Sequence, residues 1–126
     1  MRRYKRVGIY RSSFEAQLAE QIAQAGLPIQ YESQKLHYEF PAVRKIYRPD
    51  FILPNGILIE AKGLFTAADR KKLLAVRECN PGIDLRIVLQ YPNTLLRKGS
   101  PTRYADWCDK NGFLWAAKWI PEEWLA

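Results

Sequence analysis

The sequence predicts an α/β fold in which helices flank a mixed β-sheet. Three observations support this class: a helical repeat of apolar residues near the N-terminus, a tight-turn signal between two apolar runs at 51–59, and a buried-strand pattern at 84–90 between two expected helices. Together they give the order helix, strand, hairpin, helix, strand, helix, strand.

The first helix is expected to begin after Ser12 and to end at Gly26. Its apolar stripe, which should pack against the sheet, consists of Phe14, Leu18, Ile22 and Ala25. Glu15 stands three residues after Ser12, which is the spacing of a capping box. On periodicity alone, capping is favoured over metal binding for Glu15.

The next segment leads the chain from this helix to the hairpin. Residues 29–40 are rich in β-forming residues and predict one long strand or a bent pair, although the alternation slips between Ser33 and Leu36. Residues 41–48 are expected to form a basic connector that leads directly into the strand of Asp50.

The hairpin is the most informative segment. Its turn signal at 54–56 predicts two antiparallel strands. Centring the turn there places Asp50 opposite Glu60, and the two-residue repeat of a strand puts Glu60 and Lys62 on one face. Two carboxylates and an amine should therefore converge.

The second half of the chain alternates helices and strands. A helix is expected from Thr66, with Asp69 as the acid of its capping box, to about Asn80. The elements expected after it are a buried strand at 84–90, a loop at 91–99, a helix from Ser100-Pro101 to Gly112, a strand at 113–117 and a closing segment at 119–124.

Composition indicates one domain and a polyanionic partner. The chain has 126 residues, 48% of them hydrophobic, and a net charge of +7. Residues 1–11 are expected to form a basic arm that lies along phosphates, with a solvated tail as the alternative, and residues 12–126 a single domain. No apolar stretch reaches membrane-spanning length, and two cysteines with no signal-like N-terminus argue against a disulfide framework. A cytoplasmic protein is expected.

The acidic patch suggests metal-dependent phosphodiester hydrolysis. Facing carboxylates repel unless a cation or a raised pKa relieves them, and hard oxygen ligands suit Mg²⁺ or Mn²⁺. Lys62 could then orient the attacking water or neutralise charge on the phosphate. The structural alternative is that Asp50 caps a turn while Glu60 and Lys62 form a solvated ion pair, and the short motif alone leaves both open.

Ordered blocks over almost the whole chain resemble the phage endonuclease I family, which are Holliday-junction resolvases with a PD-(D/E)XK core and a restriction-endonuclease-like fold. The blocks are Val7-Gly8, Arg11-Ser12, Tyr47 to Gly56, Glu60 to Leu64, Asp69 to Lys72, Lys98 to Thr102 and Ile120-Pro121-Glu122-Glu123-Trp124. The resemblance implies that Glu15, Asp50, Glu60 and Lys62 are catalytic, which reverses the capping preference for Glu15. It also implies that the three carboxylates bind one or two Mg²⁺ ions per site.

The resemblance further implies an intertwined homodimer. Glu15 of one chain would complete the site formed by Asp50, Glu60 and Lys62 of the other, with residues 41–48 as the bridge between swapped halves. The sequence departs from the family in ending at Ala126 without the basic tail of some relatives, so that binding contribution is expected to be missing or supplied by the arm.

The expected function is Mg²⁺-dependent hydrolysis of opposing strands in four-way DNA junctions, by a phage- or prophage-encoded protein in the bacterial host. The expected phosphate contacts are Arg2, Arg3, Lys5, Arg6, Arg11, Arg44, Lys45, Arg70, Lys71 and Lys98. The alternatives are a related nuclease acting on mismatched, flapped or linear duplex DNA, and a non-catalytic basic DNA-binding module.

Overall fold

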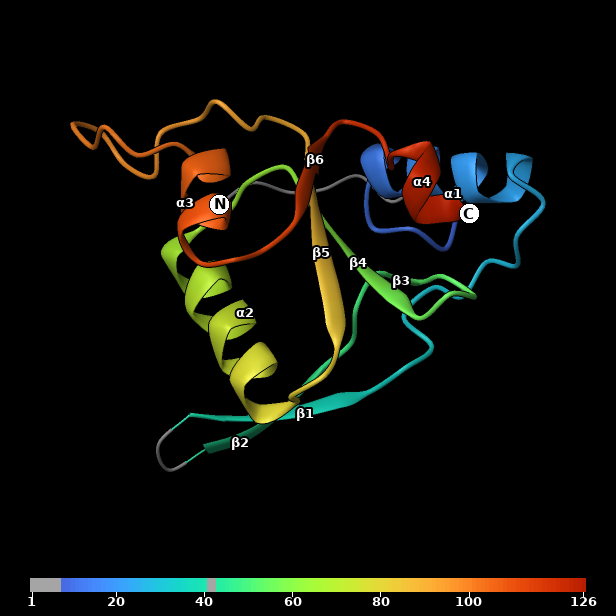
Figure 1. Cartoon of the computed structure of the whole chain (residues 1–126), viewed down its shortest axis with the longest axis horizontal. Coiled ribbons are helices and arrows are strands. Elements are labelled where there is room, and N and C mark those ends of the chain that lie inside the picture. Colours follow the sequence, from blue (N-terminus) through green and yellow to red (C-terminus); the bar gives the residue numbers. More distant parts are fainter. Residues whose placement is uncertain (1–7, 41–42) are drawn as a thin grey trace.

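The structure, a computed structural model, describes residues 8–40 and 43–126. Figure 1 shows the elements in chain order: α1 (Ser13–Gln24), β1 (Leu36–Phe40), β2 (Val43–Tyr47), β3 (Phe51–Ile52), β4 (Ile57–Lys62), α2 (Ala67–Cys79), β5 (Asp84–Leu89), α3 (Tyr104–Lys110), β6 (Trp115–Ala117) and α4 (Glu122–Leu125).

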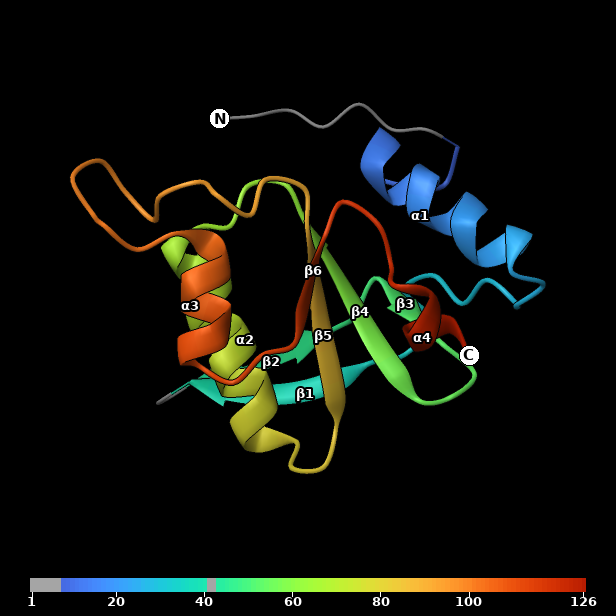
Figure 2. The same cartoon turned by 45° about the horizontal axis from the view of Figure 1, so that its top comes forward.

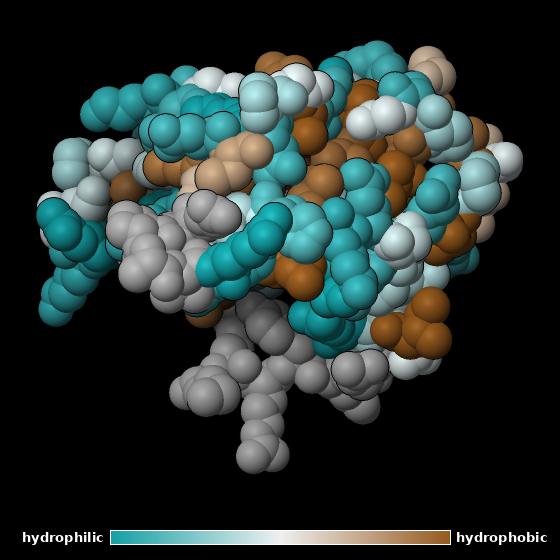
Figure 3. All heavy atoms as spheres, turned by 90° about the horizontal axis from the view of Figure 1, so that it is seen from below, coloured by the Kyte–Doolittle hydropathy of each residue, from teal (hydrophilic) through white to brown (hydrophobic). Residues whose placement is uncertain are grey.

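The central sheet has four strands in the order β3-β4-β5-β6. Strand β3 is antiparallel to β4, whereas β4, β5 and β6 run parallel. The sheet is therefore mixed, as predicted. Strands β1 and β2 form a separate antiparallel hairpin, which packs beside α2. From the side on which this hairpin lies, the surface is largely hydrophilic with hydrophobic residues showing between (Figure 3).

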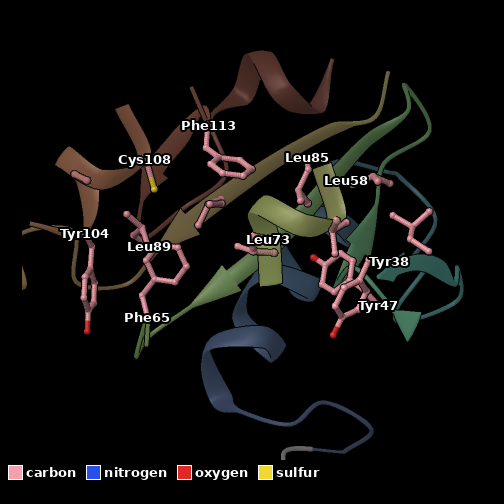
Figure 4. Packing of buried hydrophobic residues seen from close by; sticks show 14 residues of the cluster. Tyr38, Tyr47, Leu58, Phe65, Leu73, Leu85, Leu89, Tyr104, Cys108 and Phe113 are labelled. Atoms are coloured by element: carbon pink, nitrogen blue, oxygen red, sulfur yellow. The ribbon is translucent and has the colours of Figure 1, made fainter. Parts of the chain in front are cut away.

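Helices cover both faces of the sheet, with α2 and α3 on one side and α1 and α4 on the other (Figures 1 and 2). Two hydrophobic cores result because side chains of a strand alternate between faces. Leu58 of β4 enters the core beneath α2, here called the α2 core, with Leu73 and Leu85 (Figure 4). Its neighbours Ile57 and Ile59 enter the α1 core on the other face.

Three sequence predictions need correction. The strand expected at 29–40 is confined to its end, at β1. Upstream, Tyr31 makes an isolated antiparallel bridge to Phe51, and Glu32 has φ 50°, in the left-handed region, which interrupts an extended strand.

The basic connector expected at 41–48 is largely a strand, because β2 pairs with β1 throughout Val43–Tyr47. Tyr47 is buried in the α2 core, whereas Arg44, Lys45 and Ile46 are exposed. The basic residues of this segment obscured the strand pattern in which Tyr47 points inward.

The third predicted helix begins later than expected, at Tyr104 instead of after Ser100. Ser100 Oγ accepts the amide of Thr102, and Leu95 forms an isolated bridge with Arg103. These contacts hold residues 95–103 as a loop. Across the described ranges, no helix combines the length and apolar composition needed to cross a membrane.

Candidate active site

The four predicted catalytic residues line one cavity of about 570 Å³ within a single chain. The cavity lies where β4 ends at Lys62, beside the first turns of α1 and α2. Its carboxylates are buried: the exposed fraction is 9% for Glu15, 8% for Asp50 and 5% for Glu60. Buried charges of this kind are costly unless they are matched, so their partners decide what the site can do.

The hairpin places Asp50 against Glu60 as predicted. Phe51 pairs with Ile59, and continuing this register by one residue puts Asp50 opposite Glu60. The turn is closed by the amide of Gly56, which donates to the Leu53 carbonyl at 2.9 Å. Asp50 is fixed further because its Oδ2 accepts the amide of Ala61 at 2.8 Å.

Glu15 reaches the same cavity from the first turn of α1. Ser12 Oγ accepts the Glu15 amide at 3.1 Å, so half of the predicted capping box is present. The Glu15 carboxylate does not complete that box: its Oε1 accepts the amide of Arg11 at 3.3 Å and the hydroxyl of Tyr31. The side chain of Glu15 is therefore directed into the cavity and not back to the start of its helix.

Lys62 is held between two carboxylates. Its Nζ lies 3.4 Å from Glu60 Oε2 and 3.2 Å from Asp69 Oδ1. Burial alone would lower the pKa of Lys62, but the charges of Glu60, Asp69 and Asp50 outweigh it and raise the pKa. The same amine, with hydrogen bonds from Thr66, lowers the pKa of Asp69 despite its partial burial. Lys62 is consequently a fixed, protonated donor.

The ionised form of Asp50 is destabilised by its surroundings in the site. Its pKa is raised well above the usual range, first by desolvation and then by the charges of Glu60 and Glu15. A bound cation would relieve this repulsion, and an all-carboxylate donor set suits Mg²⁺ or Mn²⁺ in chemistry. Among the residues described, no three acidic, histidine or cysteine side chains are grouped so as to hold one ion. Mg²⁺ commonly takes only one or two carboxylates and completes its shell with water and substrate phosphate.

Two tyrosines that the sequence did not single out for the site contact its carboxylates. The Tyr47 hydroxyl donates to Glu60 Oε1, and the Tyr31 hydroxyl donates to Glu15 Oε1. Burial, followed by the neighbouring carboxylates, raises the pKa of both phenols. Recognition of 43–47 as a strand would have drawn attention to Tyr47, because its burial is what anchors that strand.

The predicted phosphate contacts are dispersed. Arg11 lines the cavity and pairs with Glu32 at 3.1 Å. Arg70 Nη1 donates to the Phe65 carbonyl at 2.7 Å, which turns it toward its own helix. The remaining described candidates, Arg44, Lys45, Lys71 and Lys98, are exposed and outside the cavity lining, and Arg2, Arg3, Lys5 and Arg6 lie outside the described residues.

Two basic residues outside that predicted set line the cavity instead. Arg48 follows β2, and Lys72 lies on α2 with its Nζ 5.7 Å from the centre of the Tyr47 ring. The sequence places Lys72 on a charged helix face, where periodicity cannot tell it apart from Lys71. Only the packing of α2 beside the β1–β2 hairpin separates the two.

The chain is similar to phage endonucleases over almost its whole length. The family model described as phage endonuclease I matches residues 1–126. The chain is 46% identical over 121 residues to Endonuclease I of Escherichia phage T7, covering 96% of this chain and 81% of that protein. It is 45% identical over 112 residues to Endodeoxyribonuclease 1 of Enterobacteria phage T3, covering 89% of this chain and 74% of that protein.

Proposed function

This chain belongs to the phage endonuclease I family, and on that premise we propose that it is a Mg²⁺-dependent endodeoxyribonuclease that resolves four-way DNA junctions by paired phosphodiester hydrolysis. The observation that carries the chemistry is the cavity in which three buried carboxylates meet the amine of Lys62. Desolvation, together with the charges of Glu60 and Glu15, raises the pKa of Asp50, and a strongly perturbed carboxylate in a cavity is more typical of a functional site than of a structural one.

The residues divide into two roles. Asp50, Glu60 and Glu15 would hold one or two Mg²⁺ ions, for which Mn²⁺ could substitute. A bound ion would supply polarisation of the phosphoryl oxygen and a lower pKa for the attacking water. Lys62 stays protonated between Glu60 and Asp69, so that it can orient that water and offset charge developing on the phosphate.

Binding rests on charge and shape. The net charge of +7 favours association with DNA, and Arg11, Arg48 and Lys72 line the cavity beside the carboxylates, where a scissile phosphate would enter. Contacts of this kind position a phosphate backbone without reading bases, so the choice of substrate should follow DNA geometry. The protein would act in the cytoplasm of the bacterial host.

The decisive experiment compares a four-way junction with a linear duplex of the same sequence, in Mg²⁺, Ca²⁺ and chelator. Nicking of the junction in Mg²⁺ only, in opposing strands, is expected. Asp50→Asn should abolish cleavage while junction binding persists. Equal cleavage of both substrates would show that the protein is a general duplex nuclease and not a junction resolvase. Binding without cleavage in any metal would show that it is a non-catalytic DNA-binding module.

The proposed assembly is a homodimer whose two sites are shared between chains. Within one chain, Glu15 already lines the cavity of Asp50. Exchange of the N-terminal half would preserve these contacts with the partner's Glu15, because the β1–β2 hairpin separates α1 from Asp50 in the chain and could open to carry α1 across.

Complementation tests this sharing. A Glu15→Gln chain and an Asp50→Asn chain should each be inactive, and we expect activity to return when they are unfolded together and refolded as a mixture. In a mixed dimer with shared sites, one site receives both substitutions and the other receives neither. If each chain builds its own site, both sites carry one substitution and the mixture stays inactive.

A further inference from the structure

Two of the three site carboxylates share one kind of neighbour, a tyrosine hydroxyl. Tyr47 donates to Oε1 of Glu60, and Tyr31 donates to Oε1 of Glu15. The other oxygen of Glu60 faces the amine of Lys62 at 3.4 Å. Glu60 is thus held at both oxygens, by a neutral donor on one side and a cation on the other.

The two tyrosines are anchored in different cores. Tyr47 is 4% exposed and belongs to the α2 core, where Figure 4 shows it beside Tyr38. Tyr31 packs against the α1 core, with its ring centre 4.8 Å from that of Tyr10 and 5.5 Å from that of Phe51. Since each ring is fixed by its own core, each hydroxyl presents its donor from a defined position.

Packing alone does not require these hydroxyls. Phenylalanine would fill either position with almost the same shape, and at the buried position of Tyr47 it would spare the cost of burying a polar atom. Both hydroxyls are satisfied by carboxylates of the cavity, which come from different elements, α1 and β4. The matched arrangement indicates a function that concerns the carboxylates.

We propose that Tyr31 and Tyr47 are positioning residues, which fix the orientations of Glu15 and Glu60 so that the carboxylates receive a divalent cation without rearrangement. This inference rests on the proposed function. Carboxylates that bind metals are commonly oriented by such hydrogen bonds from a second layer of residues, and loss of one partner typically weakens metal affinity or activity about 10–100-fold.

The test removes single hydroxyls by Tyr31→Phe and Tyr47→Phe. Tyr104→Phe is the matched control, since Tyr104 is 4% exposed and packs in the α2 core on α3, without lining the cavity. Mn²⁺ binding to the protein alone is measured by calorimetry, junction binding is measured in chelator, and single-turnover cleavage is measured over a range of Mg²⁺ concentrations.

For the two site variants, we expect the Mn²⁺ dissociation constant and the Mg²⁺ concentration for half-maximal cleavage to rise about 10-fold or more. Junction binding in chelator should stay at the wild-type level, which separates positioning from general loosening of the fold. Tyr104→Phe should match the wild type in all three measurements.

Wild-type cation binding and Mg²⁺ dependence in both site variants would overturn the inference while leaving the proposed function intact. A wild-type protein that neither binds Mn²⁺ nor cleaves DNA would instead overturn the proposed function. If Tyr47→Phe does not fold, as judged by circular dichroism, Tyr31→Phe tests the inference by itself, because Tyr31 packs against the other core.

Discussion

The amine of Lys62 lies 3.2 Å from Oδ1 of Asp69, and the other oxygen of Asp69 accepts the amide of Thr66 at 3.0 Å. Thr66 Oγ1 in turn accepts the amide of Asp69, which completes the capping box of α2. The sequence predicted this box, but not that its acid also holds the lysine. The position of Lys62 is therefore tied to the N-terminus of α2.

Asp69→Asn should consequently slow catalysis. The substitution removes the charge that balances Glu60 across Lys62, and the amine then moves toward Glu60. We expect the single-turnover rate to fall about 10–100-fold, which is the cost of displacing a reacting group by about 1 Å. Junction affinity in chelator should be unchanged.

Asp106→Asn is the control for Asp69→Asn. Asp106 accepts the amide of Arg103 at 3.0 Å and so occupies the corresponding place in α3, away from the cavity. Both substitutions should lower the thermal midpoint by a similar amount, because each weakens a helix cap worth about 1 kcal/mol. Equal cleavage rates in the two variants would exclude a role for Asp69 beyond capping.

Asp50→Asn should stabilise the fold at neutral pH. Because the pKa of Asp50 is raised in the folded state, the folded protein holds this proton more tightly than the unfolded chain. The contribution of this proton to stability is therefore fully present below the usual carboxyl range, and it is lost as pH rises through the raised pKa of the folded state. Asparagine removes that loss and can still accept the amide of Ala61.

Thermal melts in chelator test this prediction across pH. Each kcal/mol gained by relieving the desolvation and repulsion of this charge corresponds to roughly 3–6 °C in Tm for a chain of this size. The gain should shrink as pH falls toward the usual range of aspartate, where the wild-type carboxyl is also neutral. Saturating Mg²⁺ should narrow the gap by stabilising the wild type alone. A variant less stable than the wild type at every pH would contradict the inference that the buried charge of Asp50 destabilises the fold.

Gln21→Ala should loosen the helix that carries Glu15. The side-chain amide of Gln21 donates to the Ile120 carbonyl at 2.8 Å and accepts the Ile120 amide at 3.1 Å, which ties α1 to the segment before α4. Loss of both bonds should cost about 1–3 kcal/mol. Amide exchange in α1 should accelerate more than exchange in α2, and uniform acceleration would argue against a local tether.

The parts of the site that the sequence predicted are those set by local chemistry. Asp50, Glu60 and Lys62 follow from a turn and a two-residue repeat, neither of which depends on distant contacts. Tyr31 and Tyr47 depend on how the α1 and α2 cores meet the sheet, which periodicity does not reveal. The same limit explains why Lys71 was expected to contact phosphate although Lys72 lines the cavity.

The parts of the fold that were predicted correctly also depend on local signals in the sequence. The mixed sheet and the capped starts of α1 and α2 were predicted because turn and capping residues are local signals. The strand β2 was missed because Arg44 and Lys45 give it a basic character, and because its pairing with β1 is not encoded in a local pattern. Ser100-Pro101 has the sequence pattern of a helix start. The contacts of Ser100 and Leu95 hold this segment as a loop, so α3 begins only at Tyr104.

Gly56→Ala should disturb the site without touching it. Gly56 has φ 92°, in the left-handed region, and a Cβ built there meets no atom within 4 Å, so the effect is confined to the backbone of the turn. An L-residue in this conformation costs about 1–2 kcal/mol. Gly99→Ala is the matched control, since Gly99 has φ 83° and similar open space but lies in the loop before α3.

Both variants should lose similar stability, as measured by denaturant unfolding. Only Gly56→Ala should also raise the Mg²⁺ requirement for cleavage, because relaxation of its turn shifts the register that holds Asp50 opposite Glu60. An equal Mg²⁺ requirement in the two variants would mean that the pairing of Asp50 with Glu60 is set by the sheet and not by the turn.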